Sequence, residues 1–322
     1  MATELELKLM VQPEYLKSAC ACLDAFCEKM NDGGQGSINV RQPTLDLMNG
    51  YYDTANGLLM DNGIALRIRA VNQQYIQTVK TRGSSRIGMH ERGEWEWRIS
   101  SDVLDLSLLE EVPLPEALVD MAWSRDLVEV FRTDFKRHVW LIEYEGATIE
   151  VVCDQGVVSS SYGQDDISEL ELELKSGPEL ALYQFAKHLA AELPVQVSTV
   201  SKAQKGTRLK HRRIEFPTKP NPTDSLQAFA EYWYETWLVY WEAMFHLKDE
   251  ALLQPILSSI VQLQKCTPES VATPLAALEA KFESLFEDDD SSLLSKLAGT
   301  TDTGVIMLEV GYWLNKQLDK TQ

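Results

Sequence analysis

Apolar and polar residues alternate through most of the first two-thirds of the chain. Residues 3–11 read TELELKLMV, in which Leu5, Leu7 and Leu9 separate charged residues. A period of two places successive side chains on opposite faces of a strand. Similar stretches predict further strands at 44–54, 65–71, 75–82, 89–100, 131–146, 147–158 and 167–176. This many short strands predict a closed or nearly closed antiparallel sheet.

Helical patterns interrupt and then replace the strands. Residues 13–30 begin with proline, which favours a first helical turn, and carry an apolar stripe. A second helix is predicted at about 178–192, after a Gly-Pro pair. The proline-rich stretch EFPTKPNPTD at 215–224 is typical of a linker between domains.

Beyond this linker the pattern is helical throughout. Phe229, Trp233, Trp237, Trp241 and Phe245 recur every four residues. We interpret this stripe as the core face of a helix rather than a binding surface, because that is the commoner use of such spacing. Four or five helices are predicted to form a small bundle. The expected organisation is α+β, with a β domain at 1–212, a linker at 213–224 and a helical domain at 225–322.

Composition and charge exclude several classes of protein. The chain has 322 residues and a net charge of −19, which argues against a partner such as nucleic acid or an anionic membrane. The sequence contains no run of eighteen apolar residues, so no membrane span is predicted. It also shows no secretory signal pattern, so we expect a cytoplasmic protein. Five irregularly spaced cysteines predict reduced thiols and no zinc site.

The charge is unevenly distributed. Every arginine lies before residue 214, whereas the chain from Pro220 onward has no arginine, six lysines and sixteen acidic residues. An acidic protein that gathers its arginines in one domain is expected to contain a local anion site there.

Charged residues of several predicted strands share one face. The sets are Glu4, Glu6 and Lys8; Arg67 and Arg69; Thr78 and Lys80; His90, Arg92, Glu94, Glu96 and Arg98; Glu150 and Asp154; Glu169, Glu171, Glu173 and Lys175. An antiparallel sheet with its charged face in water would give the same pattern. Two features favour an inner, shared polar face instead. Like charges at neighbouring positions repel unless cations offset them, and other strands supply those cations.

Carboxylates and cations in one cavity fit a metal-bound polyphosphate. Mg²⁺ and Mn²⁺ prefer oxygen ligands, and Mg²⁺ is usually held by one or two carboxylates together with substrate phosphates. Arginine binds phosphate with two donors, and lysine supplies a compact charge. No Ser-His-Asp or Cys-His set and no phosphate-binding P-loop is found.

An ordered set of motifs resembles the CYTH family, also called triphosphate tunnel metalloenzymes. These are TELELK at the start, YYDT at 51–54, LRIR at 66–69, TVK at 78–80, HERGEWE at 90–96 and ELELELK at 169–175. FRTDFKR at 131–137, IEVVCDQG at 149–156 and VSTVSKAQKG at 197–206 resemble its bacterial inorganic triphosphatase branch, in which a helical CHAD domain follows. Residues 225–322 resemble a shortened or diverged CHAD domain, and their single histidine and lack of arginine argue against polyphosphate binding there.

The resemblance implies an eight-stranded antiparallel β tunnel with outer helices, and a divalent metal, Mg²⁺ or Mn²⁺, inside it. The metal ligands it implies are Glu4, Glu6, Asp154, Glu171 and Glu173, with Glu169 a further candidate. The phosphate-binding residues it implies are Lys8, Arg67, Arg69, Lys80, Arg92, Arg137 and Lys202. Glu6, Lys8, Lys80 and Glu94 are the residues expected to be catalytic, and Glu94 and Glu96 would hold a second metal or orient the cations. For Lys202 the alternative is a surface lysine after a loop.

The expected activity is metal-dependent hydrolysis of tripolyphosphate to pyrophosphate and phosphate. A class IV adenylate cyclase and a thiamine triphosphatase use the same fold and need a pocket for an organic group. A non-catalytic polyphosphate-binding protein is a further alternative, which the two acidic strands disfavour because anion capture alone needs few carboxylates.

Overall fold

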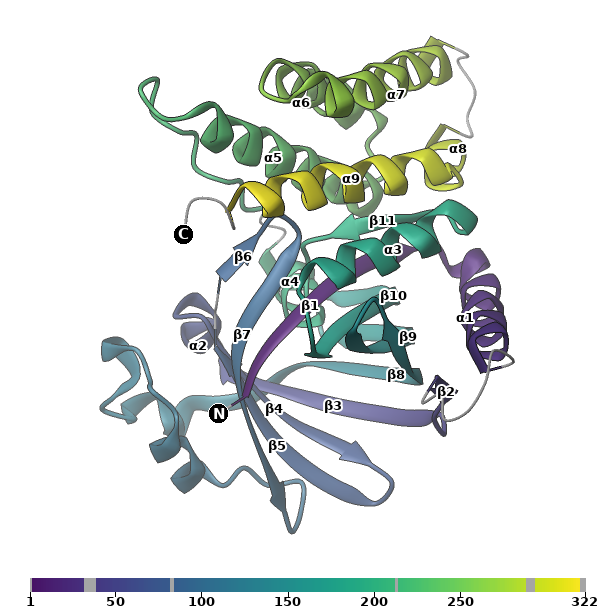
Figure 1. The fold of residues 1–322 in the computed structure, drawn as a ribbon. Helices are drawn as coiled ribbons and strands as arrows, with labels where there is room; N and C mark the ends of the chain where they lie inside the picture. The colour runs from purple at the N-terminus through teal and green to yellow at the C-terminus, as the bar shows by residue number, and fades with distance from the viewer. Residues whose placement is uncertain (1, 32–38, 82–83, 212–213, 288–292, 319–322) are drawn as a thin grey trace.

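Eight antiparallel strands form a closed ring in the computed structural model, which describes residues 2–31, 39–81, 84–211, 214–287 and 293–318 (Figure 1). They are β1 (Ala2–Val11), β3 (Leu45–Thr54), β4 (Ile64–Val71), β5 (Gln74–Thr81), β7 (Met89–Ile99), β8 (Leu127–Tyr144), β9 (Ala147–Ser160) and β10 (Gly163–Ser176). The order around the ring is β1, β10, β9, β8, β3, β4, β5 and β7. Because β1 pairs with β10 on one edge and with β7 on the other, the ring closes, which confirms the predicted β tunnel.

Three short strands extend this ring. β2 (Val40–Arg41) pairs with β8, and β6 (Ser84–Arg86) pairs with β7. β11 (Val195–Ser198) pairs with β1 at Lys8 to Val11, beyond the point where β7 leaves the same edge.

Helices cover the apolar outer face of the barrel. α1 (Leu16–Asn31), which follows a 3-10 turn at Pro13–Tyr15, packs on β8 and β9, and α3 (Leu180–Glu192) packs on β1 and β10. Leu7 and Leu9 of β1 are fully buried in this outer core. The alternation predicted from the sequence therefore has its apolar side outward, and the charged side faces the interior.

The C-terminal helices, which follow residue 225, gather on one side of the barrel, where Figure 1 shows α9 beside α3. They are α5 (Leu226–Leu247), α6 (Leu253–Lys265), α7 (Glu269–Glu287), α8 (Leu293–Ala298) and α9 (Thr301–Leu318). Trp237 and Trp241 of α5 are fully buried, as the aromatic stripe predicted. Among the described residues, no helix has an apolar run long enough to cross a membrane.

The helices share one continuous core with the outer face of the barrel. The two surfaces approach closely at Gly304 of α9, where a Cβ atom would lie 1.8 Å from the carbonyl oxygen of Val195 in β11. Only glycine allows this contact, so α9 is docked directly on the strand that extends the barrel. The domain limits at 1–212, 213–224 and 225–322 stay a prediction.

Several short elements were not predicted from the sequence. Between β7 and β8 lie 3-10 turns at Leu106–Glu111, Glu116–Leu118 and Ala122–Asp126, and another, Glu250–Leu252, precedes α6. α2 (Leu58–Asp61) follows β3, and α4 (Lys202–His211) follows β11. α4 matters for function because it carries Lys202 into the barrel.

Candidate active site

The barrel interior contains a charged cavity of about 370 Å³, which we call the tunnel cavity. The predicted site residues that line it are Glu6, Lys8, Arg67, Arg69, Lys80, Glu94, Arg137, Glu171, Glu173 and Lys202. The described lining contains seven cationic side chains, namely the six lysines and arginines of this list and Lys175. It contains six carboxylates, namely the four glutamates of the list together with Glu96 and Glu150. The cavity is thus nearly balanced in charge, whereas the whole chain carries −19.

Strand register explains why distant residues meet there. Glu6 lies opposite Glu173, and Lys8 lies opposite Glu171, across the β1 and β10 pair. Because the side-chain period is two, these four residues point to the same face. The alternation ELELK against ELELELK therefore delivers a patch of mixed charge to the inside of the barrel.

Glu171 is the carboxylate at which three cations converge. Its Oε2 atom accepts a hydrogen bond of 2.8 Å from Arg137, and its Oε1 atom is bonded by Lys8 and lies 3.1 Å from Lys202 Nζ. Burial opposes ionisation of Glu171, but Lys202, Lys8 and Arg137 outweigh it and hold its pKa well below the usual value. Burial alone would lower the pKa of Lys8, but the carboxylates of Glu171 and Glu6 raise it above its usual value.

Lys202 occupies the centre of an acidic cluster. Asp154, Glu169 and Glu171 place one oxygen each within 4.8 Å of one another, as a metal site would require. The Lys202 ammonium contacts all three carboxylates, with 2.6 Å to Asp154 Oδ2. This geometry excludes the alternative of a surface lysine, because Lys202 is 7% exposed. The lysine already supplies the positive charge that a metal would bring to this cluster.

Asp154 lies behind the tunnel cavity rather than on its wall. Its side chain is fully buried and accepts hydrogen bonds of 2.8 and 2.6 Å from Nε and Nη2 of Arg137. Burial opposes its ionisation, but Arg137 and Lys202 outweigh that effect and hold the pKa of Asp154 below its usual value. The carboxylate thus fixes the direction of two cations that line the cavity.

A second group of charges comes from β4, β5 and β7. Glu94 Oε1 lies 3.5 Å from Arg67 Nη2 and 3.3 Å from Lys80 Nζ, and Glu96 Oε1 lies 3.9 Å from Arg67. Burial lowers the pKa of Arg67, but Tyr51 and Glu94 raise it above its ordinary value. Glu94 therefore orients two cations on the wall opposite Glu171.

Arg69 differs from the other arginines of the cavity. Within the described part of the chain its hydrogen bond is to the neutral Asn49, at 2.9 Å from Nε to Oδ1, and it forms no ion pair. Burial, together with Arg67 and Arg137, lowers its pKa to about 9. A half-buried cation beside like charges is costly, and a bound anion would offset that cost.

The carboxylates that face the cavity suit a hard divalent cation. Glu6 and Glu173 are direct cross-strand partners, so two oxygen donors of like charge lie side by side near the cavity wall. Such donors match the oxygen preference of Mg²⁺ and Mn²⁺. The backbone of Glu4 pairs with that of Arg92, but the side chains of both predicted site residues lie outside the described part of the structure.

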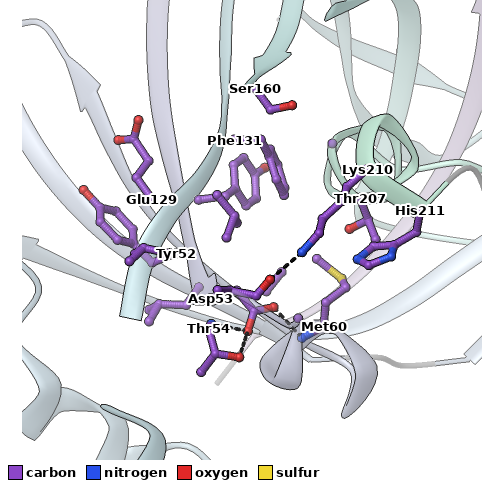
Figure 2. A pocket seen from close by; sticks show the side chains of 18 of the residues that line it. Tyr52, Asp53, Thr54, Met60, Glu129, Phe131, Ser160, Thr207, Lys210 and His211 are labelled. Carbon is purple, nitrogen blue, oxygen red and sulfur yellow. Dashed lines mark hydrogen bonds between the residues drawn. The ribbon is translucent and has the colours of Figure 1, made fainter. Parts of the chain in front are cut away.

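A second cavity of about 200 Å³ adjoins the first, and Tyr51 and Ala65 line both. Figure 2 shows its wall, with Tyr52 and Phe131 on one side and Thr207, Lys210 and His211 of α4 on the other. Tyr51 stacks on Phe131 with ring centroids 4.5 Å apart. Lys210 donates a hydrogen bond to the carbonyl oxygen of Ala55. The lining of this cavity, which we call the aromatic cavity, has more apolar than polar surface.

Tyr51 and Asn49 were not predicted as site residues. Tyr51 receives a long hydrogen bond of 3.5 Å from Arg67, and Asn49 holds Arg69. Both lie on the inner face of β3, just before the irregularity between Tyr51 and Tyr52. The period-two pattern of 44–54 was the available signal, because it places Asn49 and Tyr51 on one face.

Fold and cavity define a closed β-tunnel protein with a charged interior. Comparison with known proteins names the family: the family model of the CYTH domain matches residues 2–207, and the chain belongs to the CYTH family. The resemblance inferred from the sequence motifs is thereby confirmed for this part of the chain, and the likeness of the C-terminal helices to a CHAD domain stays a prediction.

Among curated proteins, the chain is similar to an inorganic triphosphatase of Haemophilus influenzae. The two are 32% identical over 213 residues, which cover 64% of this chain and 54% of that protein. The chain therefore spans about half the length of the curated relative that it matches.

The chain is also similar to solved structures at lower identity. A putative adenylyl cyclase from Hippeastrum, described as having a dominant triphosphatase activity, is 20% identical with a TM-score of 0.44, covering 66% of this chain and 97% of that one. A putative adenylate cyclase from Bacillus halodurans is 21% identical with a TM-score of 0.37, covering 63% and 98%. At these levels the two likenesses add nothing to the argument about activity.

Proposed function

We propose that the protein is a metal-dependent inorganic triphosphatase that hydrolyses tripolyphosphate to pyrophosphate and phosphate. The observation that carries the proposal is that Arg67, Arg69 and Arg137 line one cavity, where burial and the other two arginines lower the pKa of Arg69 to about 9. Tripolyphosphate would supply negative charge beside Arg69, which has no carboxylate partner among the described residues. Similarity to the Haemophilus influenzae inorganic triphosphatase supports the same substrate.

In this proposal the cations bind and orient the phosphate chain. Lys8, Arg67, Arg69, Lys80 and Arg137 line the cavity from four different strands and would contact successive phosphoryl groups. Lys202 and, by its backbone position on β7, Arg92 would add to this set. Many fixed cations suit phosphoryl transfer because charge builds up on the phosphate oxygens in the transition state.

Four carboxylates would hold Mg²⁺ or Mn²⁺: those of Glu4 and Glu6 on β1 and those of Glu171 and Glu173 on β10. The metal would neutralise phosphate charge and polarise a water. Overall, the water oxygen forms a new bond to phosphorus and the water gives up a proton to the solvent, while the phosphoanhydride P–O bond breaks and pyrophosphate leaves with that bond's electron pair. Glu94 lies 3.3 Å from Lys80 and would orient this lysine, which would fix the terminal phosphate for this attack.

Asp154 has a different role in this proposal from the metal ligand suggested by the family resemblance. Its two oxygens are bonded by Arg137 and Lys202, and it does not line the cavity. We assign it the positioning of those two cations. Glu169, which bonds Lys202, has the same role.

The aromatic cavity supports a second candidate, an organic triphosphate as substrate. Because Tyr51 and Ala65 border both cavities, a ring system beyond the tunnel cavity would lie against Tyr51 and Phe131. A nucleotide cyclised by an adenylate cyclase, or thiamine triphosphate, offers such a ring. A protein that binds polyphosphate without hydrolysis is the third outcome.

One panel separates these functions. Phosphate release is measured from tripolyphosphate, ATP and thiamine triphosphate with Mg²⁺ or Mn²⁺, with a chelator as control and cyclic AMP assayed in parallel. We expect tripolyphosphate to give the highest kcat/KM and the chelator to abolish release. Faster turnover of an organic triphosphate would favour the second candidate. Thermal stabilisation by tripolyphosphate without phosphate release would favour the third function, a polyphosphate-binding protein without catalytic activity.

A further inference from the structure

The short segment that carries Lys202 into the barrel is held from outside by the C-terminal helices. β11 ends at Ser198, and Thr199 to Ser201 lead into α4, whose first residue is Lys202. Ser201 and Gln204 close the start of α4 reciprocally, with 2.8 Å from Ser201 N to Gln204 Oε1 and 3.2 Å from Gln204 N to Ser201 Oγ. This is a capping box, which fixes where the helix begins.

Glu242 of α5 contacts both sides of that helix start. Its Oε2 atom accepts hydrogen bonds of 3.2 Å from Ser198 Oγ and 3.4 Å from Thr199 N. Its Oε1 atom lies 3.9 Å from Nη1 of Arg208, further along α4. The side chain of Glu242 is 10% exposed, so these polar contacts lie in a largely water-excluded place where a lost partner is costly.

We propose that Glu242 is a positioning residue for Lys202, so that the C-terminal helical region completes the tunnel site. This inference rests on the proposed function. Glu242 joins the segment before α4 to α4 itself, and Lys202, the first residue of α4, lies between the two contacts. The Lys202 ammonium must reach Asp154, Glu169 and Glu171 on the inner wall, and a shift of the helix start would move all three contacts together.

The docking of the helices makes this contact rigid. Gly304 of α9 lies against the backbone of β11, and Gln196 Nε2 donates to the carbonyl oxygen of Ala298 at 3.2 Å. Tyr234 of α5 donates to the carbonyl oxygen of Met307 in α9 at 2.9 Å. Glu242 is therefore held on an element that is itself fixed to the strand preceding Lys202.

A double-mutant cycle with Glu242→Ala and Lys202→Ala tests the inference, with kcat/KM for tripolyphosphate as the first readout. We expect Glu242→Ala to lower kcat/KM at least about tenfold in the wild-type background, the scale of a lost charged hydrogen bond. In the Lys202→Ala background the same change should alter kcat/KM by less than about twofold, because coupled residues are not additive. An equal loss in both backgrounds would overturn the inference, since a general structural effect does not depend on Lys202.

Two variants serve as matched controls. Glu242→Gln keeps an oxygen that accepts from Ser198 and Thr199, and should retain activity within about threefold. Glu235→Gln changes another acid of α5, which accepts a hydrogen bond from Ile87 N, and should leave kcat/KM unchanged. If Glu242→Ala fails to fold, Ser198→Ala removes one donor of the same contact and should show the same dependence on Lys202.

Hydrogen exchange of residues 198–206 separates this inference from the proposed function. Glu242→Ala should speed exchange of these amides, and Glu235→Gln should not. Wild-type protein that releases no phosphate would refute the proposed function, and the exchange result would still decide whether Glu242 fixes the segment. Unchanged exchange in Glu242→Ala would overturn the inference even in an active enzyme.

Discussion

Replacing Arg69 with methionine should make the ligand-free protein more stable and its phosphate binding weaker. Arg69 lies beside Arg67 and Arg137, and burial together with these charges lowers its pKa well below its ordinary value, to about 9. At neutral pH this arginine is charged in the unfolded chain, so a lowered pKa in the folded state means that its charge opposes folding. Each pKa unit corresponds to about 1.36 kcal/mol, so the full shift amounts to roughly 4–5 kcal/mol.

Two effects reduce the gain expected from the substitution. Arg69 is partly exposed, so solvent screens its charge and less than half of the full figure applies. Asn49 Oδ1 also loses the donor at 2.9 Å, which costs about 1 kcal/mol. Arg69→Met should then raise the free energy of unfolding by about 1 kcal/mol, equivalent to roughly 2 °C in Tm.

Scanning calorimetry with and without tripolyphosphate and Mg²⁺ tests both halves of this prediction. Wild-type Tm should rise with ligand, because a ligand that binds only the folded state stabilises it. Arg69→Met should begin at a higher Tm and respond much less. Arg132→Met is the control, since Arg132 is an exposed arginine paired with Glu129 at 2.8 Å and should change neither quantity. A lower Tm without ligand, or an unchanged ligand response, would refute the reasoning.

Three further predictions concern the other groups of charges and the docked helix. Glu6→Gln and Lys8→Ala should each lower turnover of tripolyphosphate at least ~100-fold with the fold intact by circular dichroism, and near-normal phosphate release in either would contradict the site. Asp154→Asn should lower the free energy of unfolding at pH 7 by about 3 kcal/mol, because Asp154 has a lowered pKa and its ion pairs stabilise the folded state above about pH 4. That difference should shrink as pH falls below about 4 in denaturant titrations, whereas a constant difference down to pH 3 would argue against the ion pairs as its cause. Gly304→Ala should lower stability by about 2–3 kcal/mol in thermal unfolding, because its Cβ atom would overlap the Val195 carbonyl oxygen, and an unchanged Tm would show that α9 is not docked so closely.

Local periodicity was enough to predict the wall of the tunnel. A strand has two faces, so TELELK and ELELELK can only place their carboxylates and lysines together, and closure of the ring then decides that this face is interior. Glu6, Lys8, Glu171 and Glu173 were found in this way. The family motifs then indicated which of the charged strands belong to one barrel.

The partners of each charge could not be predicted from the pattern. Lys202 bonds Glu169 and Asp154, which lie on two other elements, and this depends on where α4 crosses the barrel. The helical signal of α4 is weak because Gly206 interrupts it, although the capping box of Ser201 and Gln204 was visible in the sequence. Gly206 itself is required by tertiary packing, since a Cβ atom there would lie 2.3 Å from the Phe131 ring.

The buried contact of Glu242 was hidden for a similar reason. The aromatic stripe of α5 predicted that Trp237 and Trp241 are buried, and both are fully buried. Glu242 follows Trp241 and carries no sequence signal of burial, because an acidic residue next to a core position is normally on the solvent side. Its partners Ser198 and Arg208 are more than thirty residues earlier in the chain, so only the docked helices reveal them.

The near balance of charge in the tunnel cavity has a consequence for ligand binding. Without a ligand, Glu171 pairs with Lys8, Arg137 and Lys202 and offsets part of the cost of burying these cations. A phosphate that binds these cations must compete with Glu171, and the carboxylate that it displaces is then available to a divalent cation. We expect tripolyphosphate and the metal to bind more tightly together than either does alone, because each removes the charge that the other leaves unpaired. Calorimetric titration of tripolyphosphate with and without Mg²⁺ measures this coupling, and equal affinities would show that the carboxylates only hold the cations in place.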